Sequence, residues 1–424
     1  MKLKKIYMML GLALLLGSCK SEEPADPGQT RSVEVPVSFT IRLATENGGT
    51  RAAGDDDTTP TIWEEGENHE KEGGTSFDNK IVSILPAVYK VTDNTMEATP
   101  SATMKYLNDP EPKKDANGNV LEGQYVVSGI MTFQNTSTDA VTSGDYRLAL
   151  YINCGAGDMK TALNPASAGE AMFYHHGIPG ANKDASFGSK TFNSIPMYGV
   201  APIIFEKTNG FIEAKGTSAN NEISVNVLRS MAKVRVVLAD GIKDKVNLTS
   251  LGMNRHALKG YVCPKGWNKT GNVAGLSSTE YMRAAKGDAN SYNHNCLTTD
   301  ETNFSGATWA NSSNRIRFYL PETYNRNRDD IDGSEELKLT IKYDILDNGK
   351  KFPKEHDMYF REWSTWNNKN YKGDSWDIIR NHIYEFVITD VEPTTGKLIV
   401  NVAVKPWEKH ELTEWWDKFP DPAN

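Results

Sequence analysis

Several residue types that could do chemistry occur close together in this 424-residue chain. Tyr174-His175-His176-Gly177 contains two adjacent histidines, but neighbours on a strand point to opposite faces, so they make a poor metal pair. The acidic run over residues 329–336 lacks the alternating ligand spacing of a calcium loop and is interpreted as a solvated loop. The sequence contains no Gly-x-Ser-x-Gly, no phosphate-binding loop and no Cys-x-x-Cys. We therefore expect no metal, no cofactor and no enzymatic activity.

Cys19 is the residue whose position favours a specific reaction. It follows a positive stretch, an apolar stretch and two small residues, namely Lys2, Lys4 and Lys5, residues 6–16, and Gly17-Ser18. This order resembles the bacterial lipobox, in which the cysteine thiol is the nucleophile that receives diacylglycerol. The apolar stretch is too short to span a membrane comfortably. Residues 1–18 are therefore predicted to be a lipoprotein signal peptide, with Cys19 as the lipidated residue.

Charge and composition limit the partners and the fold class. Removing residues 1–18 deletes three lysines and no acidic residue, which takes the formal net charge from −8 to −11. So acidic a chain has no electrostatic basis for binding nucleic acid, and its membrane attachment would come from the lipid. Glycine, asparagine, threonine and serine are abundant and long amphipathic helical periods are scarce, which favours strands in two or three domains.

Three cysteines follow Cys19, at positions 154, 263 and 296. An exported chain permits a disulfide between Cys263 and Cys296. Because the count is odd, at least one of the three thiols stays unpaired.

The cleanest alternation in the chain covers residues 33–43. Apolar side chains occupy every second position, at Val33, Val35, Val37, Phe39, Ile41 and Leu43. This pattern predicts a half-buried strand, and Pro36 favours an edge position because it cannot donate to a ladder. The polar, glycine-containing segment from Glu46 to about residue 75 has no apolar period and predicts a disordered loop that exposes Arg51.

Further strands are predicted along the rest of the chain, over residues 80–91, 125–127, 144–153, 223–238, 315–320, 337–346, 383–391 and 397–404. The period of the long run breaks near Arg229-Ser230-Met231-Ala232, and we place a domain boundary there. The prediction is an all-β chain with two tandem β-sandwich, transthyretin-like domains and long loops, over residues 52–229 and 230–407. Strand 33–43 would complete the first domain in the precursor.

Short motifs spread over most of the mature chain resemble one family in their order and spacing. Besides the lipobox they are Thr50-Arg51-Ala52 after the first strand, Asp78-Asn79-Lys80-Ile81-Val82, Gly144-Asp145-Tyr146, Ile195-Pro196-Met197-Tyr198-Gly199, Arg229-Ser230-Met231-Ala232-Lys233-Val234, Arg380-Asn381-His382-Ile383-Tyr384 and Val402-Ala403-Val404-Lys405-Pro406-Trp407. Together they resemble the fimbrillins of Bacteroidales, which are the type V pilins.

The resemblance implies a maturation pathway. An outer-membrane lipoprotein precursor reaches the cell surface, where an arginine-specific protease cuts the loop after the first strand and the subunit joins a fimbrium. Here the cut would fall between Arg51 and Ala52, so that residues 19–51, the tether and first strand, leave as a propeptide. A strand of another fimbrial subunit then fills the apolar groove. Arg31 is a rival site, but a cut there would leave strand 33–43 in place.

The C-terminus is the family's usual source of the replacement strand. The donor candidate is the last alternating run, formed by Leu398, Val400, Val402 and Val404. The tail over residues 408–424 departs from the family's pattern, because Leu412, Trp415, Trp416 and Phe419 follow a helical spacing that predicts a short helix. This departure keeps open a tip or accessory subunit, or an anchor subunit that retains its lipid.

One alternative lies outside the family. A surface lipoprotein that never polymerises could bind glycans on an aromatic platform, and Trp363, Trp366 and Trp376 lie close enough in sequence to form one.

Overall fold

The structure is a computed structural model that describes residues 32–43, 81–107, 109–154, 163–174, 195–242, 244–253, 259–265, 267–268, 315–323, 337–360 and 377–406. Strands dominate these ranges, which confirms the prediction of an all-β chain. The helical elements among them are short: α2 (Thr138–Thr142) and the 3₁₀ turns η1 (Pro165–Glu170) and η3 (Asp240–Ile242). Ser137 caps α2, since its side chain accepts a hydrogen bond from the backbone N–H of Ala140.

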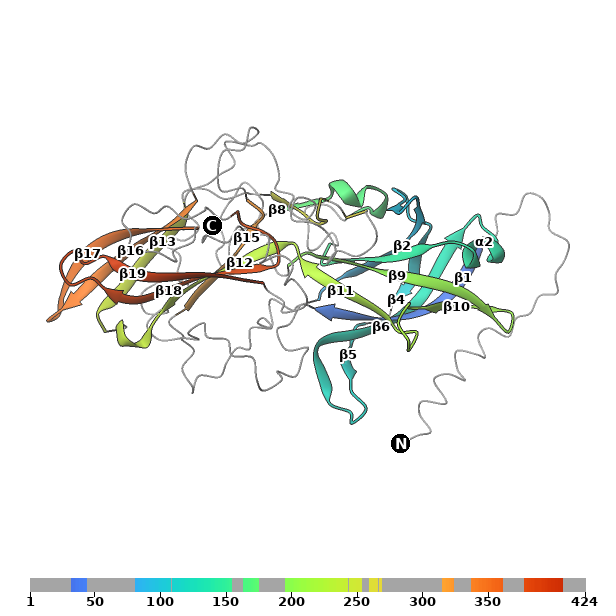
Figure 1. The fold of residues 1–424 in the computed structure, drawn as a ribbon, viewed down its shortest axis with the longest axis horizontal. Coiled ribbons are helices and arrows are strands. Elements are labelled where there is room, and N and C mark those ends of the chain that lie inside the picture. Colours follow the sequence, from blue (N-terminus) through green and yellow to red (C-terminus); the bar gives the residue numbers. More distant parts are fainter. Residues whose placement is uncertain are drawn as a thin grey trace, which may run out of the picture.

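The first group of strands builds one large sheet. Its members are β1 (Ser32–Leu43), β2 (Ile84–Thr92), β3 (Thr95–Met96), β4 (Ala102–Leu107), β5 (Glu111–Lys114), β6 (Val120–Gln134), β7 (Tyr146–Ile152), β9 (Met197–Thr208), β10 (Phe211–Lys215) and β11 (Ile223–Arg229). Seven of them follow one another in the order β1-β11-β9-β7-β2-β4-β6, and β6 pairs again with β1. The ladder therefore closes into a seven-stranded barrel (Figure 1).

The prediction of two tandem β-sandwich domains is not confirmed, and in the first group of strands β1 joins the two ends of the sheet. β6 and β11 would otherwise be separated, and β1 pairs with both, antiparallel to β6 and parallel to β11. Wherever β1 is paired with both β6 and β11, the barrel wall has no free strand edge. Strand β1 is thus the element that converts an open sheet into a barrel.

The second group of strands forms two smaller sheets. One has the order β15-β12-β18-β19, with bounds Arg315–Pro321, Met231–Leu238, His382–Val391 and Leu398–Pro406. The other has the order β13-β16-β17, with bounds Val246–Met253, Lys338–Asp347 and Lys350–Tyr359. Both sheets contribute buried side chains to a single core, which includes Val234, Phe386, Leu248 and Ile341. The described parts of the barrel and of these two sheets lie end to end (Figure 1).

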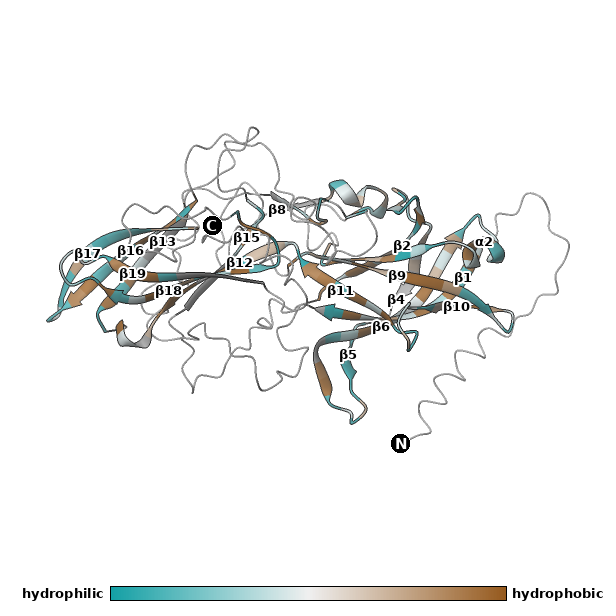
Figure 2. Ribbon diagram, viewed as in Figure 1, coloured by the Kyte–Doolittle hydropathy of each residue, from teal (hydrophilic) through white to brown (hydrophobic). Residues whose placement is uncertain are grey.

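Strands occur at several of the predicted places, but the bounds of some differ from the prediction. The run over 223–238 is two strands, β11 and β12, which separate at Ser230 and belong to different sheets. The short strand predicted over 125–127 is the middle of the fifteen-residue β6, which runs from Val120 to Gln134. The hairpin β16–β17 turns at Asn348 and Gly349, whose φ angles of 49° and 78° are both positive, as a two-residue hairpin turn requires, and its β17 strand is mostly hydrophilic (Figure 2).

A set of buried polar residues links the barrel to the smaller sheets. We call it the junction network, formed by Arg229, Ser230, Glu322, Arg380 and Asn381. The Arg380 guanidinium donates to Glu322 Oε2 at 2.8 Å and to the carbonyl of Val262 at 2.7 Å. Asn381 Oδ1 accepts from the backbone N–H of Arg229 at 3.3 Å, and Ser230 Oγ donates to the same Val262 carbonyl at 2.7 Å.

The junction network brings together motifs that are far apart in sequence. The backbone N–H of Ser230 donates to the carbonyl of Pro196, and that of Asn381 donates to the carbonyl of Met231. A two-stranded sheet lies beside it, in which β8 (Met172–Tyr174) pairs with β14 (Lys259–Tyr261). The motifs around residues 196, 230 and 381 therefore meet at one place, where the chain passes from the barrel to the smaller sheets.

Candidate strand-exchange site

The burial of β1 follows its sequence alternation. Val35, Val37, Phe39 and Ile41 are between 0% and 4% exposed, and Val33 is partly buried against the same core. The polar residues between them, including Glu34 and Ser38, are exposed, and Thr40 is the exception. The prediction of a half-buried strand is therefore confirmed for residues 33–41, while the side chain of Leu43 lies outside the described residues.

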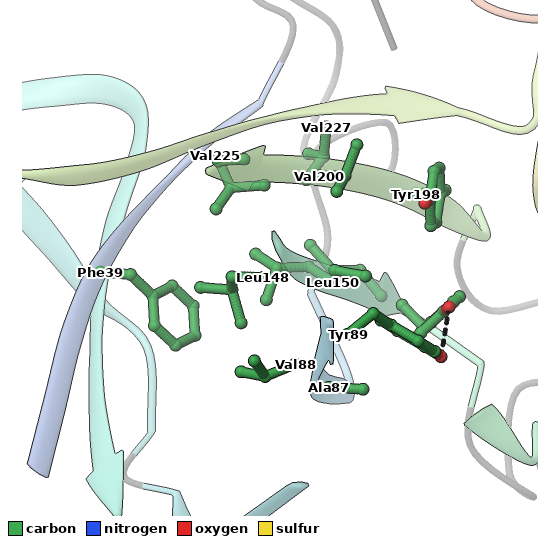
Figure 3. Packing of buried hydrophobic residues seen from close by; sticks show 14 of the residues in the cluster. Phe39, Ala87, Val88, Tyr89, Leu148, Leu150, Tyr198, Val200, Val225 and Val227 are labelled. Atoms are coloured by element: carbon green, nitrogen blue, oxygen red, sulfur yellow. Dashed lines mark hydrogen bonds between the residues drawn. The ribbon is translucent and has the colours of Figure 1, made fainter. Parts of the chain in front are cut away.

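The inward side chains of β1 lie in a slot between β6 and β11. Phe39 stands opposite Val127 of β6 and Ile223 of β11, and Ile41 stands opposite Tyr125 and Val225. Figure 3 shows the Phe39 ring directed into the barrel toward Leu148 and Val88. Paired positions of this kind point to the same face of a sheet, so the slot has fixed apolar sites for alternate residues of whatever strand occupies it.

The predicted edge position of β1 is wrong for the strand as a whole. β1 pairs with β6 from Ser32 to Arg42, and with β11 from Phe39 onward. Pro36 is tolerated because it lies before the region of double pairing, opposite Ile130 of β6 alone. The strand is thus singly paired in its first half and doubly paired in its second half.

The apolar contacts of β1 are large enough to matter for the whole barrel. At about 25 cal/mol per Å² and on the order of 100 Å² per side chain, the four buried residues contribute about 10 kcal/mol, as an upper estimate. This amount is comparable with the total stability of an ordinary domain. A barrel that lost β1 would therefore expose an apolar slot and two unpaired strand edges.

The outer face of the slot contains one polar contact set, which we call the Glu222 clamp. Glu222 Oε1 accepts from Thr40 Oγ1 at 2.6 Å and from Ser224 Oγ at 3.1 Å, and it forms an ion pair with Lys113 Nζ. Partial burial opposes ionisation, but the hydrogen bonds from Lys113, Thr40 and Ser224 outweigh it and lower the pKa of Glu222 to about 2. The carboxylate is therefore charged at neutral pH.

Sequence reasoning missed the Glu222 clamp. Thr40 occupies a polar position in the alternation, as Ser38 does, and nothing local distinguishes the two. Lys113 reaches Glu222 because the turn from Asp115 to Asn119 folds β5 back on β6, and Asp115 accepts from the backbone N–H groups of Asn117 and Asn119.

The donor candidate forms β19, an edge of its sheet that pairs with β18. Leu398 and Val400 lie in the core shared by the two smaller sheets, at 1% and 9% exposure. The side chains of Val402 and Val404 lie outside the described residues. In this structure, the first half of the donor candidate therefore packs in the core of its own two sheets.

Other residues considered in the sequence analysis lie outside the described residues. They are Cys19, the Arg51–Ala52 bond, the histidines of 175–176, the acidic run 329–336, Trp363, Trp366, Trp376 and the tail 408–424. Cys154 and Cys263 are both buried, and Cys263 Sγ lies 3.6 Å from the carbonyl oxygen of Ala168. Cys296 also lies outside the described ranges, so its pairing stays a prediction.

Two further kinds of site, a membrane span and a metal centre, have no candidate among the described residues. No helix among them has the length and apolar character to cross a membrane. They also contain no group of three or more histidine, cysteine or acidic side chains placed to hold a metal ion.

Comparison with known proteins gave matches only among solved structures. No family model matches the sequence, and no curated protein matches it. The structures that match include fimbrial and candidate cell-adhesion proteins of Bacteroidales.

Among them is the tip fimbrial protein Mfa3 from Porphyromonas gingivalis, truncated at its C-terminus. It is 11% identical with a TM-score of 0.46, and the match covers 89% of this chain and 100% of that one. A fimbrial assembly protein from Parabacteroides distasonis is 10% identical with a TM-score of 0.39, covering 88% and 96%. A candidate cell-adhesion protein from the same species is 12% identical with a TM-score of 0.40, covering 89% and 97%. Identities of this size leave the function to be inferred from the residues of this chain.

Proposed function

We propose that this chain is a structural subunit of surface fimbriae, made as a lipoprotein, cut after Arg51 and polymerised by strand exchange. The observation that carries the proposal is the place of β1. It closes the barrel by lying between β6 and β11, two strands that are distant from it in sequence. Its inward residues fill an apolar slot, and the chain reaches the next described strand, β2, only at Ile84.

A cut after Arg51 would separate β1 from the barrel covalently. The strand would then be held by its two ladders, its buried side chains and its hydrogen bond to Glu222, and another strand can form contacts of all three kinds. Loss of the strand would expose the slot, and main-chain pairing with a replacement would restore both ladders. In this scheme Cys19 delivers the precursor to the outer membrane and departs with β1 as part of residues 19–51.

The proposal divides the mature subunit at the junction network. Residues 52–229 form the domain that accepts the strand, and residues 230–407 form the second domain. The donor candidate Leu398–Val404 would have to leave the core of its own sheets, where Leu398 and Val400 are buried. Donation by this segment is therefore favourable only if the segment buries more surface in the slot of a neighbouring subunit than it buries in its own domain.

Mutation of the cleavage site tests the proposal. Wild-type precursor treated with an arginine-specific protease should acquire an N-terminus at Ala52 and form polymers visible by electron microscopy. Arg51→Ala should remain uncut at this position and monomeric, whereas Arg31→Ala, the matched control, should mature normally. Polymers formed by Arg51→Ala at the wild-type rate would overturn the proposed pathway.

A further inference from the structure

The slot of β1 has a polar requirement in addition to its apolar sites. Thr40 lies on the outward face of the strand, yet only 3% of it is exposed. Its hydroxyl donates to Glu222 Oε1 at 2.6 Å. Ser38, two residues earlier on the same face, is exposed and contacts the neutral hydroxyl of Ser128 at 3.1 Å. Position 40 is thus the outward position of β1 at which the barrel covers the side chain.

The acceptor at this position belongs to the barrel and not to β1. Glu222 precedes β11, Ser224 lies on β11, and Lys113 lies on β5. The backbone of Glu222 is held as well. The N–H of Glu222 donates to Asn220 Oδ1 at 3.3 Å, and the carbonyl of Glu222 accepts from Ser218 Oγ at 2.9 Å. If β1 leaves, this frame remains and loses only the Thr40 hydroxyl, so the next occupant meets the same carboxylate.

An apolar side chain at position 40 would be covered by the barrel without donating to Glu222. A hydrogen bond to a charged group is stronger than one between neutral groups, and desolvating a charged acceptor without replacing its donor is unfavourable. The direction of the incoming strand is also fixed, because both ladders are restored in the β1 geometry only by a strand parallel to β11 and antiparallel to β6.

We propose that the slot selects its occupant by a hydrogen-bond donor at the position of Thr40. The partner is a strand of a neighbouring subunit with alternating apolar residues and a serine, threonine or asparagine between two of them, as Asn401 lies between Val400 and Val402 in the donor candidate. The Glu222 clamp would favour such a strand, because its carboxylate lies on the barrel beside that one outward position. This inference rests on the proposed exchange of β1.

Strand competition on the nicked full chain tests the inference. A recognition sequence for a site-specific protease is inserted between residues 52 and 74, the chain is cut, and a labelled synthetic peptide of residues 32–43 competes with the resident strand. The Thr40→Val peptide keeps the branched shape but has no hydroxyl, and should bind at least about tenfold more weakly than the wild-type peptide. The Ser38→Ala peptide is the matched control and should stay within about threefold, since its bond is exposed and neutral.

A chain with Glu222→Ala completes a double-mutant cycle with the Thr40→Val peptide. Without the Glu222 carboxylate, the wild-type and Thr40→Val peptides should bind about equally. Equal binding of these two peptides to wild-type chain would overturn the inference and leave strand exchange intact. Failure of every peptide to enter the slot would overturn strand exchange, and the inference with it.

Hydrogen exchange of the intact chain gives a second readout that needs no cut. Thr40→Val should speed amide exchange over residues 39–43 relative to Ser38→Ala, and unchanged exchange would also count against the role of Thr40.

Discussion

At the scale of single residues, Phe39 is the largest side chain that β1 places in the barrel. It is 1% exposed and stands opposite Val127 and Ile223. Phe39→Ala should destabilise the barrel by about 3–5 kcal/mol, because the removed ring leaves a cavity that the strands can fill only in part. Denaturant unfolding measures this value. Arg42→Ala, an exposed change on the same strand, should stay within about 0.5 kcal/mol, and equal effects of the two would contradict the packing described here.

The lowered pKa of Glu222 predicts how the unfolding free energy of the chain depends on pH. Its pKa falls from the ordinary 4.5 to about 2 in the folded chain, so the stability it contributes is complete above pH 4.5 and is lost as the pH falls toward 2. The difference in unfolding free energy between wild type and Glu222→Gln should therefore be constant near neutrality and shrink across that window. Unfolding at several pH values measures it, with the exposed Glu111→Gln as control. A difference independent of pH would contradict the Glu222 clamp.

At the scale of elements, β1 should behave as a removable part of the barrel. A chain that begins at residue 44 should self-associate, because it exposes the slot and the edges of β6 and β11. A peptide of residues 32–43 should return it to a monomeric one-to-one complex in analytical ultracentrifugation. The same peptide with Val35→Asp and Ile41→Asp should not, since two charges would enter the apolar slot. A truncated chain that stays monomeric without peptide would argue against an open slot.

The alternation of β1 could be predicted from sequence because one face is buried and the other is largely exposed, and the structure confirms it for residues 33–41. The neighbours of β1 could not be predicted, since pairing between residues 39 and 223 depends on ladders formed across the whole barrel. For the same reason the closure of the sheet was missed. β17 was also missed, because its sequence Lys350-Lys351-Phe352-Pro353-Lys354-Glu355 is exposed and has no apolar period.

Two short polar motifs lie together in the structure, which their residue types alone do not predict. Arg229-Ser230 and Arg380-Asn381 contributed to the family resemblance by order and spacing, and the structure brings them together in the junction network. Burial of an arginine against Glu322 is a long-range property that no local pattern encodes. The Glu222 clamp is similar, because Thr40, Lys113 and Glu222 come from three separate strands or their ends.

At the scale of the whole molecule, the junction network should couple the barrel to the smaller sheets. Arg380 and Glu322 are each about 1% exposed and pair at 2.8 Å. Arg380→Met leaves a buried carboxylate without its cation and should cost about 3–5 kcal/mol. Differential scanning calorimetry should show a lowered melting temperature.

The matched control for this change is Lys338→Met, which breaks a half-exposed pair with Asp357 at 2.7 Å. It should cost about 0–1 kcal/mol, because solvent screens the pair. Similar losses from the two substitutions would contradict the importance of burial at the junction network.

In the proposed pathway, β1 fills its slot only until assembly. Mass spectrometry of the subunits within purified fimbriae tests it most directly, because it determines which residues each assembled chain retains. We predict subunits that begin at Ala52 and lack residues 32–43. Assembled subunits that still contain residues 32–43 would contradict the account.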